Sequence, residues 1–206
     1  MVNTLLAHDL LWGMASEQLP ADAPAWLVES ISAGQPVVVR RALSVAGEIA
    51  VGVRGRLREQ RYATSMAITS MTRRVTPEEL CHVDIDRDLP ALQALAQLRP
   101  MLDARGWVWG VSGSAGFELA SGFTALHEGS DLDLILRTPQ PLSRVESRAM
   151  VAMLDTVNCV VDMQLQTPFG AVALREWAGS SNRVLLKNAR QACLVLDPWN
   201  PLEQAA

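Results

Sequence analysis

The sequence has few cysteines, no long apolar run and no excess of basic residues. Its three cysteines, Cys81, Cys159 and Cys193, lie far apart in 206 residues, which argues against the disulfide framework of a small secreted protein. No segment approaches the ~20 uninterrupted apolar residues that a membrane helix needs. The apolar start carries His8 and Asp9 and lacks the basic stretch of a signal peptide. We therefore expect a cytoplasmic protein without a membrane partner.

Basic residues are fewer than acidic ones, with 18 lysines and arginines against 22 aspartates and glutamates and a formal net charge of -4. Proteins that bind the nucleic-acid backbone usually carry an excess of cations that displaces counterions. The charge balance therefore argues against nucleic acid as the main partner. It does not exclude a small phosphorylated ligand held by a few local cations.

Apolar residues make up 49% of the chain and charged residues 19%, which excludes disordered and collagen-like classes. The length fits one large domain or two small ones. Polar turn residues around 76–88 separate two differently patterned segments. We predict a smaller N-terminal α/β domain over residues 1–80 and a second domain over residues 81–206.

The N-terminal segment mixes helical and strand patterns. Apolar residues at helical spacing mark 25–31, and valine-rich runs predict strands at 36–41 and 47–55. Residues 57–75 fit a turn followed by a strand. Residues 76–79, with the sequence TPEE, predict a helix start because they combine a capping threonine, a proline and a capping-box glutamate.

The C-terminal segment alternates strands with helices. Leucines at a spacing near 3.6 predict a helix at 89–105, which Pro100 should end or kink. A capping box from Ser143 to Glu146 opens another helix. The remaining patterns predict strands at 107–113, 131–137 and 157–166, a hairpin of 183–187 with 193–197, and helices at 115–123 and 146–156.

The most informative motif is the pair Asp131 and Asp133 in the segment GSDLDL. Side chains alternate between the faces of a strand, so both carboxylates point one way while Leu132 and Leu134 point the other. Two adjacent carboxylates on a hydrophobic strand repel each other and resist desolvation. A cation between them removes both problems, and oxygen ligands favour Mg²⁺ or Mn²⁺.

A third carboxylate has the matching phase. In the segment VNCVVDMQLQ, Asp162 shares one strand face with Gln164 and Gln166. If this strand lies beside 131–137, Asp162 reaches the same cation. Three aspartates on adjacent strands suit a two-metal site for phosphoryl transfer, whose ions lie roughly 3.5–4 Å apart.

Gly113 and Ser114 stand where a strand is expected to meet a helix N-terminus. Glycine lets the backbone approach a phosphate, and the N–H groups and dipole of the helix favour negative charge. We expect this turn to hold a polyphosphate whose reacting phosphorus lies at the metal site.

Each signal also has a weaker interpretation. A lone D-x-D is common, although simple loop capping by Asp131 and Asp133 conflicts with their apolar neighbours. Lys187 either contacts phosphate or is an exposed hairpin lysine. An arginine cluster either contacts phosphate or forms a solvated face, and Arg54 and Arg56 are its candidates for substrate binding. The cluster comprises Arg40, Arg41, Arg54, Arg56, Arg58 and Arg61.

Gly113-Ser114, Asp131-Leu132-Asp133 and Asp162 together resemble the nucleotidyltransferase superfamily of the DNA polymerase beta type. The gap of sixteen residues between Ser114 and Asp131 is longer than that superfamily usually has. Nearly the whole chain is similar to malonate decarboxylase holo-acyl-carrier-protein synthases, also called phosphoribosyl-dephospho-CoA transferases. The matching segments are HDLLW at 8–12, PVVVRRA at 36–42, IAVGVRG at 49–55, GSAGFELASG at 113–122, SDLDLILR at 130–137, VDMQLQTPFGAVALREWA at 161–178, and VLLK and LVLDPW near the C-terminal end.

The resemblance implies an α+β fold whose C-terminal domain is a nucleotidyltransferase-like mixed sheet with flanking helices. It implies transfer of phosphoribosyl-dephospho-CoA from triphosphoribosyl-dephospho-CoA to a serine of the apo acyl-carrier subunit of malonate decarboxylase, with release of pyrophosphate. Asp131 and Asp133 match the catalytic carboxylates, and Asp162 matches the third superfamily aspartate. Residues 81–206 would then be the catalytic domain and residues 1–80 a recognition domain.

A two-metal mechanism would distribute the roles as follows. One ion, held by all three aspartates, would bind the serine hydroxyl and lower its pKa. The other, held by Asp131 and Asp133, would neutralise the leaving pyrophosphate, which Gly113 and Ser114 would cradle. Asp162 is a candidate to accept the hydroxyl proton directly.

Two other functions stay open at this point. A generic nucleotidyltransferase acting on a small molecule or another protein would share the C-terminal motifs, but it gives no reason for the match in the first half. A non-enzymatic module that delivers the precursor to a partner has little need of three intact carboxylates. A donor screen with ATP would test the first alternative, and a lack of Mg²⁺ binding would favour the second.

Overall fold

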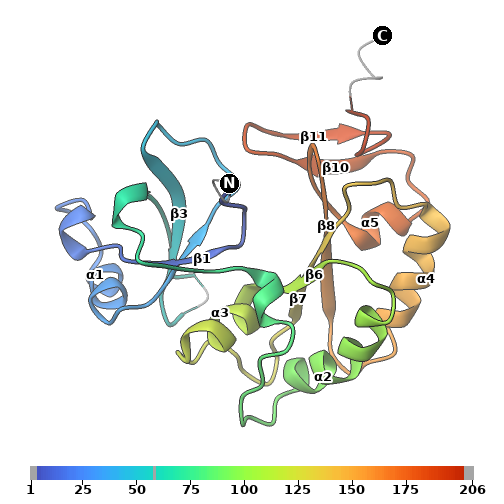
Figure 1. Ribbon diagram of the computed structural model, residues 1–206, viewed down its shortest axis with the longest axis horizontal. Helices are drawn as coiled ribbons and strands as arrows, with labels where there is room; N and C mark the ends of the chain where they lie inside the picture. The colour runs from blue at the N-terminus through green and yellow to red at the C-terminus, as the bar shows by residue number, and fades with distance from the viewer. Residues whose placement is uncertain (1–3, 58, 202–206) are drawn as a thin grey trace.

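The computed structural model describes residues 4–57 and 59–201 and contains two β-sheets, one from each half of the chain (Figure 1). Arg58, a member of the arginine cluster, lies outside the described residues. None of the helices in the described part of the chain has the length and apolar character that a bilayer crossing requires. Cys81, Cys159 and Cys193 are free thiols, in agreement with the expected lack of a disulfide framework.

The N-terminal sheet is antiparallel, with five strands in the order β4-β3-β2-β1-β5. The predicted helix at 25–31 and the strands at 36–41 and 47–55 are confirmed. Residues 57–75 contain two strands where one was predicted, and the first strand of the sheet was not anticipated. The elements are β1 (Leu10–Trp12), η1 (Ser16–Gln18), α1 (Ala25–Ser32), β2 (Val37–Val39), β3 (Glu48–Arg54), β4 (Arg61–Ala67), η2 (Ile68–Ser70) and β5 (Arg73–Val75).

The helix start predicted at 76–79 is a single 3₁₀ turn, η3 (Pro77–Leu80). The Thr76 N–H donates a hydrogen bond to the Glu79 carboxylate at 2.6 Å, as a capping box requires. The turn does not extend into an α-helix because the turn-like, acidic segment DIDRD follows almost at once. It leads directly from the N-terminal sheet to the second half.

The C-terminal sheet is mixed, with six strands in the order β11-β10-β9-β8-β7-β6, and only β7 and β8 run parallel. The predicted strands, the hairpin and the capping box at Ser143 are confirmed. A short strand and helix after residue 167 were not anticipated. The elements are α2 (Pro90–Asp103), β6 (Trp109–Val111), α3 (Gly113–Ser121), β7 (Leu132–Arg137), α4 (Arg144–Leu154), β8 (Val161–Thr167), β9 (Gly170–Ala173), α5 (Leu174–Ala178), β10 (Val184–Lys187) and β11 (Ala192–Val195).

Helix α2 does not end at Pro100, contrary to the first of the two predicted outcomes. The ring removes one backbone donor, but the Pro100 carbonyl still accepts a hydrogen bond from the Ala104 N–H at 3.1 Å. The helix therefore continues for another turn and ends at Asp103.

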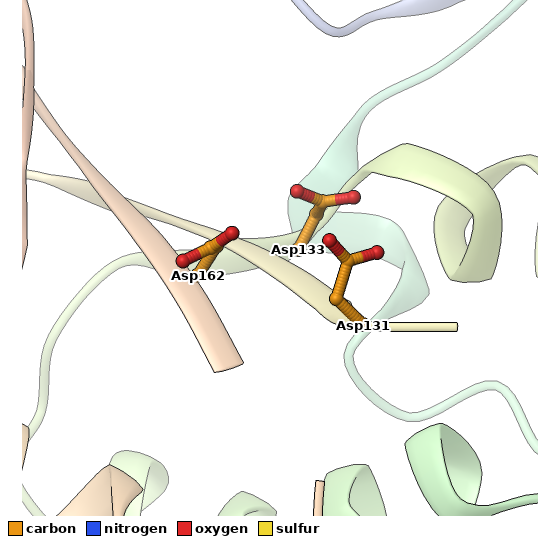
Figure 2. Close-up of side chains that lie close together, drawn as sticks. All are labelled: Asp131, Asp133 and Asp162. Carbon is orange, nitrogen blue, oxygen red and sulfur yellow. The ribbon is translucent and has the colours of Figure 1, made fainter. Parts of the chain in front are cut away.

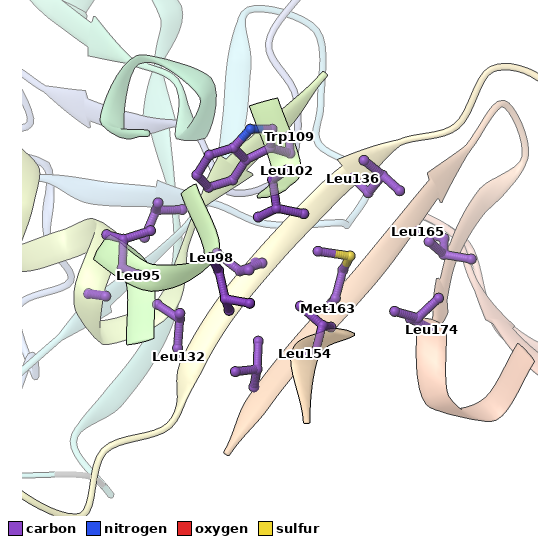
Figure 3. Close-up of a cluster of buried hydrophobic side chains, with 14 of the residues drawn as sticks. Leu95, Leu98, Leu102, Trp109, Leu132, Leu136, Leu154, Met163, Leu165 and Leu174 are labelled. Carbon is purple, nitrogen blue, oxygen red and sulfur yellow. The ribbon is translucent and has the colours of Figure 1, made fainter. Parts of the chain in front are cut away.

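The alternation predicted for β7 separates a core face from a polar face. Leu132, Leu134 and Leu136 are at most 1% exposed and belong to a core that also includes the leucines of α2 (Figure 3). A smaller second core fills the N-terminal half, but Leu10 of β1 and Val75 of β5 belong to the larger one. The protein is therefore a two-domain α+β protein in which the larger hydrophobic core draws on both halves.

Candidate active site

Three aspartates converge at the carboxyl-bearing face of β7 and β8. These strands are parallel neighbours, and their register places Asp133 directly opposite Asp162. Asp131 immediately precedes β7 and points to the same side (Figure 2). One carboxylate oxygen from each residue lies within 4.8 Å of the other two. The predicted neighbourhood of the three carboxylates, here named the aspartate cluster, is confirmed.

The electrostatics of the aspartate cluster favour a bound cation. Burial, followed by the charges of Asp131 and Asp162, raises the pKa of Asp133 to about 6 against the opposing effect of Arg54. A divalent cation would remove this repulsion and offset the desolvation. Within the described residues, this is the one group of three such side chains close enough to share an ion. The all-oxygen donor set suits a hard cation.

Gly113 lies against the aspartate cluster at the predicted turn between β6 and α3. Its φ is +61°, and a Cβ at this position would lie 1.8 Å from Asp133 Oδ2. The Ser112 N–H also donates a hydrogen bond to the Asp133 carbonyl at 2.9 Å. Only glycine allows this approach, so the turn and the carboxylates form one compact unit.

Arg54 of β3 reaches across from the N-terminal sheet to α3. Its two terminal nitrogens donate to Ser114 Oγ at 3.2 and 3.3 Å, and its guanidinium lies 5.0 Å from the centre of the Phe117 ring. Burial, and then the charge of Arg61, lowers the pKa of Arg54 to about 10, so the side chain stays charged at neutral pH. Ser114 therefore holds the positively charged guanidinium of Arg54 in place beside the aspartate cluster.

A cavity of about 1370 Å³ lies between the two halves, and two of the three aspartates line it. Asp131, Asp133, Gly113 and Ser114 line it from the C-terminal half. Its size suits a large cofactor-like ligand. From the N-terminal half it receives the side chains of Arg40, Arg54, Arg56 and Arg61.

Two other residues singled out in the sequence lie elsewhere. Lys187 is exposed on β10, two strands away from β8, and does not line the cavity. Arg41 does not line it either, since its guanidinium donates to the Gln166 side chain at 2.9 Å. The structure therefore brings together the aspartates, the Gly113 turn and four arginines, but it leaves out Lys187 and Arg41.

Glu118 of α3 fixes the connection that leads from α3 to Asp131. Its side chain is 3% exposed, and its Oε2 accepts hydrogen bonds from the Ala125 and Leu126 N–H groups at 2.7 and 2.8 Å. It also forms an ion pair with Arg87. Sequence pattern alone does not reveal Glu118, because an acidic residue inside a helix usually indicates a solvated face.

His8 is a second residue that the analysis of motifs did not assign to the site. It lines the cavity from the N-terminal half, two residues before β1 begins at Leu10. Burial, and then the charges of Arg41 and Arg137, lowers its pKa to about 4, so the imidazole is neutral at pH 7. The sequence signal that could have indicated His8 is its position as the first residue of HDLLW, one of the segments that are similar to the family.

Comparisons with known proteins show the family to which the chain is similar. The models of the phosphoribosyl-dephospho-CoA transferase MdcG N-terminal and C-terminal domains match residues 6–77 and 79–198. A curated protein of Pseudomonas fluorescens strain Pf0-1, named phosphoribosyl-dephospho-CoA transferase, is 70% identical over all of both chains. Proteins with the same name from P. fluorescens strain Pf-5 and Azotobacter vinelandii strain DJ are 63% and 53% identical, over 98% and 93% of this chain and 97% and 93% of theirs.

No solved structure matches the chain significantly. The likeness of the C-terminal sheet to polymerase-beta-type nucleotidyltransferases therefore stays a prediction. The two family models, in contrast, cover almost all of the sequence, and relatives match it along its whole length. The chain belongs to the phosphoribosyl-dephospho-CoA transferase family.

Proposed function

We propose that this protein transfers a phosphoribosyl-dephospho-CoA group from triphosphoribosyl-dephospho-CoA to a serine of the apo acyl-carrier subunit of malonate decarboxylase in the cytoplasm, releasing pyrophosphate. The observation that carries the proposal is a cavity in which two members of the aspartate cluster, Asp131 and Asp133, share the lining with four arginines, in a member of this family. Carboxylates that gather a cation and arginines that bind phosphates are the groups that transfer from a triphosphate requires.

Asp131, Asp133 and Asp162 would hold Mg²⁺ or Mn²⁺. When bound, the cation supplies positive charge to the reacting phosphates and lowers the pKa of an adjacent hydroxyl. The protein's own part is to fix the three carboxylates, through the register of β7 with β8 and the close contact of Gly113 with Asp133. This preorganisation is the main contribution expected of protein groups in phosphoryl transfer.

The donor's triphosphate would bind between the Gly113 turn and the arginines. Arg54 is already oriented by Ser114 and Phe117, so it loses little side-chain freedom when it binds a phosphate. Arg56 is exposed at the cavity and would add a second guanidinium. The negative donor would thus be neutralised locally in a protein whose net charge is -4.

The proposed division of labour follows the two halves. Residues 81–206 carry the aspartate cluster and would act as the catalytic domain, and residues 1–80 carry the arginines and would recognise the donor. Lys187 was expected to bind substrate, and its exposed place on β10 leaves it outside the cavity. The role that remains for Lys187 is a contact with the docked acyl-carrier protein.

The direct experiment is mass spectrometry of the apo carrier protein after incubation with this protein, the donor and Mg²⁺. The expected result is a mass gain equal to one phosphoribosyl-dephospho-CoA group on a serine, with one pyrophosphate released per group transferred. A parallel incubation with ATP in place of the donor distinguishes a generic nucleotidyltransferase, which would add AMP. Calorimetry with Mg²⁺ tests the binding-module alternative, which predicts that no metal binds.

A further inference from the structure

His8 has a backbone conformation that side-chain-bearing residues rarely adopt. Its φ is +79°, and among the described residues it is the one non-glycine residue with a positive φ. Such a conformation persists only where the surroundings enforce it, and strained residues of this kind concentrate at active sites and ligand clamps. The conformation of His8 therefore suggests a functional role for its imidazole.

The neighbours of His8 hold its backbone from both sides. Its N–H donates to the Val39 carbonyl at 2.9 Å, and the Val39 N–H donates to the Asp9 carbonyl at 2.8 Å. Asp9 is fully buried, and its Oδ2 accepts from the Leu6 N–H and pairs with Arg74, each at 2.8 Å. The turn before β1 is thus fixed at several points and directs the His8 side chain to the cavity.

The imidazole meets the C-terminal sheet at Gln164. Gln164 lies two residues beyond Asp162 on the same face of β8, and it forms a side-chain hydrogen bond with His8. This bond raises the pKa of His8. In the neutral imidazole, one ring nitrogen carries the proton and the other carries a lone pair that can accept one.

His127, the other histidine that lines the cavity, has no free ring nitrogen to accept a proton. His127 is exposed in the connection before β7, and its Nδ1 already accepts the Gly129 N–H at 3.1 Å. The carboxylates of the aspartate cluster would be engaged by the cation they gather. His8 is thus a neutral acceptor in the same cavity that is not itself a member of the cluster.

We propose that His8 is a catalytic residue of this protein, which binds the acceptor serine hydroxyl through its free ring nitrogen and takes its proton. This inference rests on the proposed function. In the step, the serine Oγ forms a bond to the α-phosphorus of the donor, and the bond from that phosphorus to the bridging oxygen of the β-phosphate breaks. Pyrophosphate leaves with the electron pair, and the proton on His8 passes to solvent.

The charge of the donor makes His8 a better base when it is needed. In the unliganded protein, burial and two arginines oppose protonation of the ring. A bound triphosphate brings several negative charges into the cavity, and these favour the imidazolium. His8 would therefore become more basic when the donor is bound, and it would assume the proton-accepting role first considered for Asp162.

The test replaces His8 with glycine, which adopts a φ of +79° without strain and leaves a space for free imidazole. In the mass-spectrometric transfer assay, His8→Gly should lower kcat by roughly 100-fold or more. The KM for the donor and the rise in melting temperature caused by Mg²⁺ should stay near wild type. Added imidazole should restore part of the lost kcat. His82→Gly, at an exposed histidine outside the cavity, is the matched control and should leave kcat unchanged.

A second variant keeps the test decisive if His8→Gly folds poorly. Asparagine tolerates a positive φ but offers no basic nitrogen, so His8→Asn should lose as much kcat and should not respond to imidazole. Near-wild-type kcat in whichever variant folds would overturn the proposal. A loss of kcat in folded His8→Gly that imidazole does not restore would also overturn it, because His8 would then only shape the cavity. If wild-type protein transfers nothing, the proposed function itself fails.

Discussion

The two sheets contribute opposite charges to the same cavity. The N-terminal half lines it with arginines and His8 but with no acidic residue, whereas the C-terminal half supplies the carboxylates. Arg175, a cation contributed by the C-terminal half, is paired with Asp155 at 2.6 Å. Neither half is therefore a complete site: under the proposed function, one half would gather the metal and the other would neutralise the phosphates.

The halves also differ in how they are held. The aspartate cluster stands on strands whose opposite face lies in the larger core, so its carboxylates are fixed by packing. Most of the arginines that line the cavity are exposed at the surface of a smaller sheet, and Arg54 is the half-buried exception. Changes in the C-terminal half should therefore abolish chemistry, and changes in the N-terminal half should weaken binding.

The largest expected effect comes from removing a carboxylate. Asp131→Ala should lower transfer by roughly a thousandfold or more, because a metal held by the aspartate cluster would supply several kcal/mol of transition-state stabilisation. The same loss is expected for Asp133→Ala. The rate of mass gain on the carrier protein is the measurement, with Asp86→Ala at an exposed position as the control. Full activity of Asp131→Ala or Asp133→Ala would show that catalysis does not depend on the aspartate cluster.

Gly113→Ala should come next, because a Cβ would collide with Asp133 Oδ2. We expect about a 100-fold loss of transfer and loss of the melting-temperature rise caused by Mg²⁺. Gly122→Ala is the matched control, since Gly122 also has a positive φ, of +74°, but a Cβ there meets nothing within 4 Å. The control should lose about 1 kcal/mol of stability and keep its response to Mg²⁺. Equal behaviour of the two variants would contradict the close contact with the aspartate cluster.

Arg54→Gln tests the binding half of the comparison. Loss of a half-buried charged donor should raise the KM for the donor by about 10- to 100-fold and leave Mg²⁺ binding intact. Steady-state kinetics and calorimetry with Mg²⁺ give the two readouts, and Arg148→Gln on the exposed side of α4 serves as the charge-matched control. Unchanged kinetics would assign the arginines to an ordinary solvated surface.

Asp133→Asn should make the metal-free fold more stable at neutral pH. The pKa of Asp133 is raised from 3.8 to about 6, so its ionisation destabilises the metal-free fold. This cost is absent below pH 3.8, grows between pH 3.8 and 6, and is complete above pH 6. In EDTA at pH 7, the variant should therefore be more stable by about 1–3 kcal/mol in urea unfolding, and the gain should vanish near pH 3.5. A less stable variant at pH 7 would show that burial and repulsion of the Asp133 carboxylate do not destabilise the metal-free fold.

The smallest effect is expected from Lys187→Gln. Lys187 is exposed on β10 and outside the cavity, so the KM for the donor should change by less than about twofold. The same steady-state assay used for Arg54→Gln measures it. A large rise in this KM would show that the donor also contacts the C-terminal sheet outside the cavity. Donor binding would then not be confined to the N-terminal half.

Side-chain alternation predicted the essential part of the site. Because β-strands have a period of two, the phases of Asp131, Asp133 and Asp162 could be read from the sequence, and the parallel pairing of β7 with β8 then brought them together. Sheet order is a tertiary property, so the exclusion of Lys187 could not be predicted from the local pattern of its hairpin.

Other features were not visible for physical reasons. A histidine in left-handed conformation has no spacing signature, since the strain at His8 comes from Asp9 and Val39. The strand β1 was missed because its three residues are too few to show a period. Pro100 does not end its helix, because the loss of a single backbone donor is not enough to end a helix that packs into the core.

Glu118 has a consequence for how related sequences are recognised. Its carboxylate anchors the first part of the connection between α3 and Asp131, and the pairing of Ser112 with the Asp133 backbone fixes the two ends of that connection beside each other. Residues between these anchors can be inserted or deleted at little energetic cost, because the loop-closure penalty rises only slowly with length. Searches that require a fixed spacing between the Gly-Ser turn and the D-x-D motif would overlook such proteins, whereas searches anchored at both ends would find them.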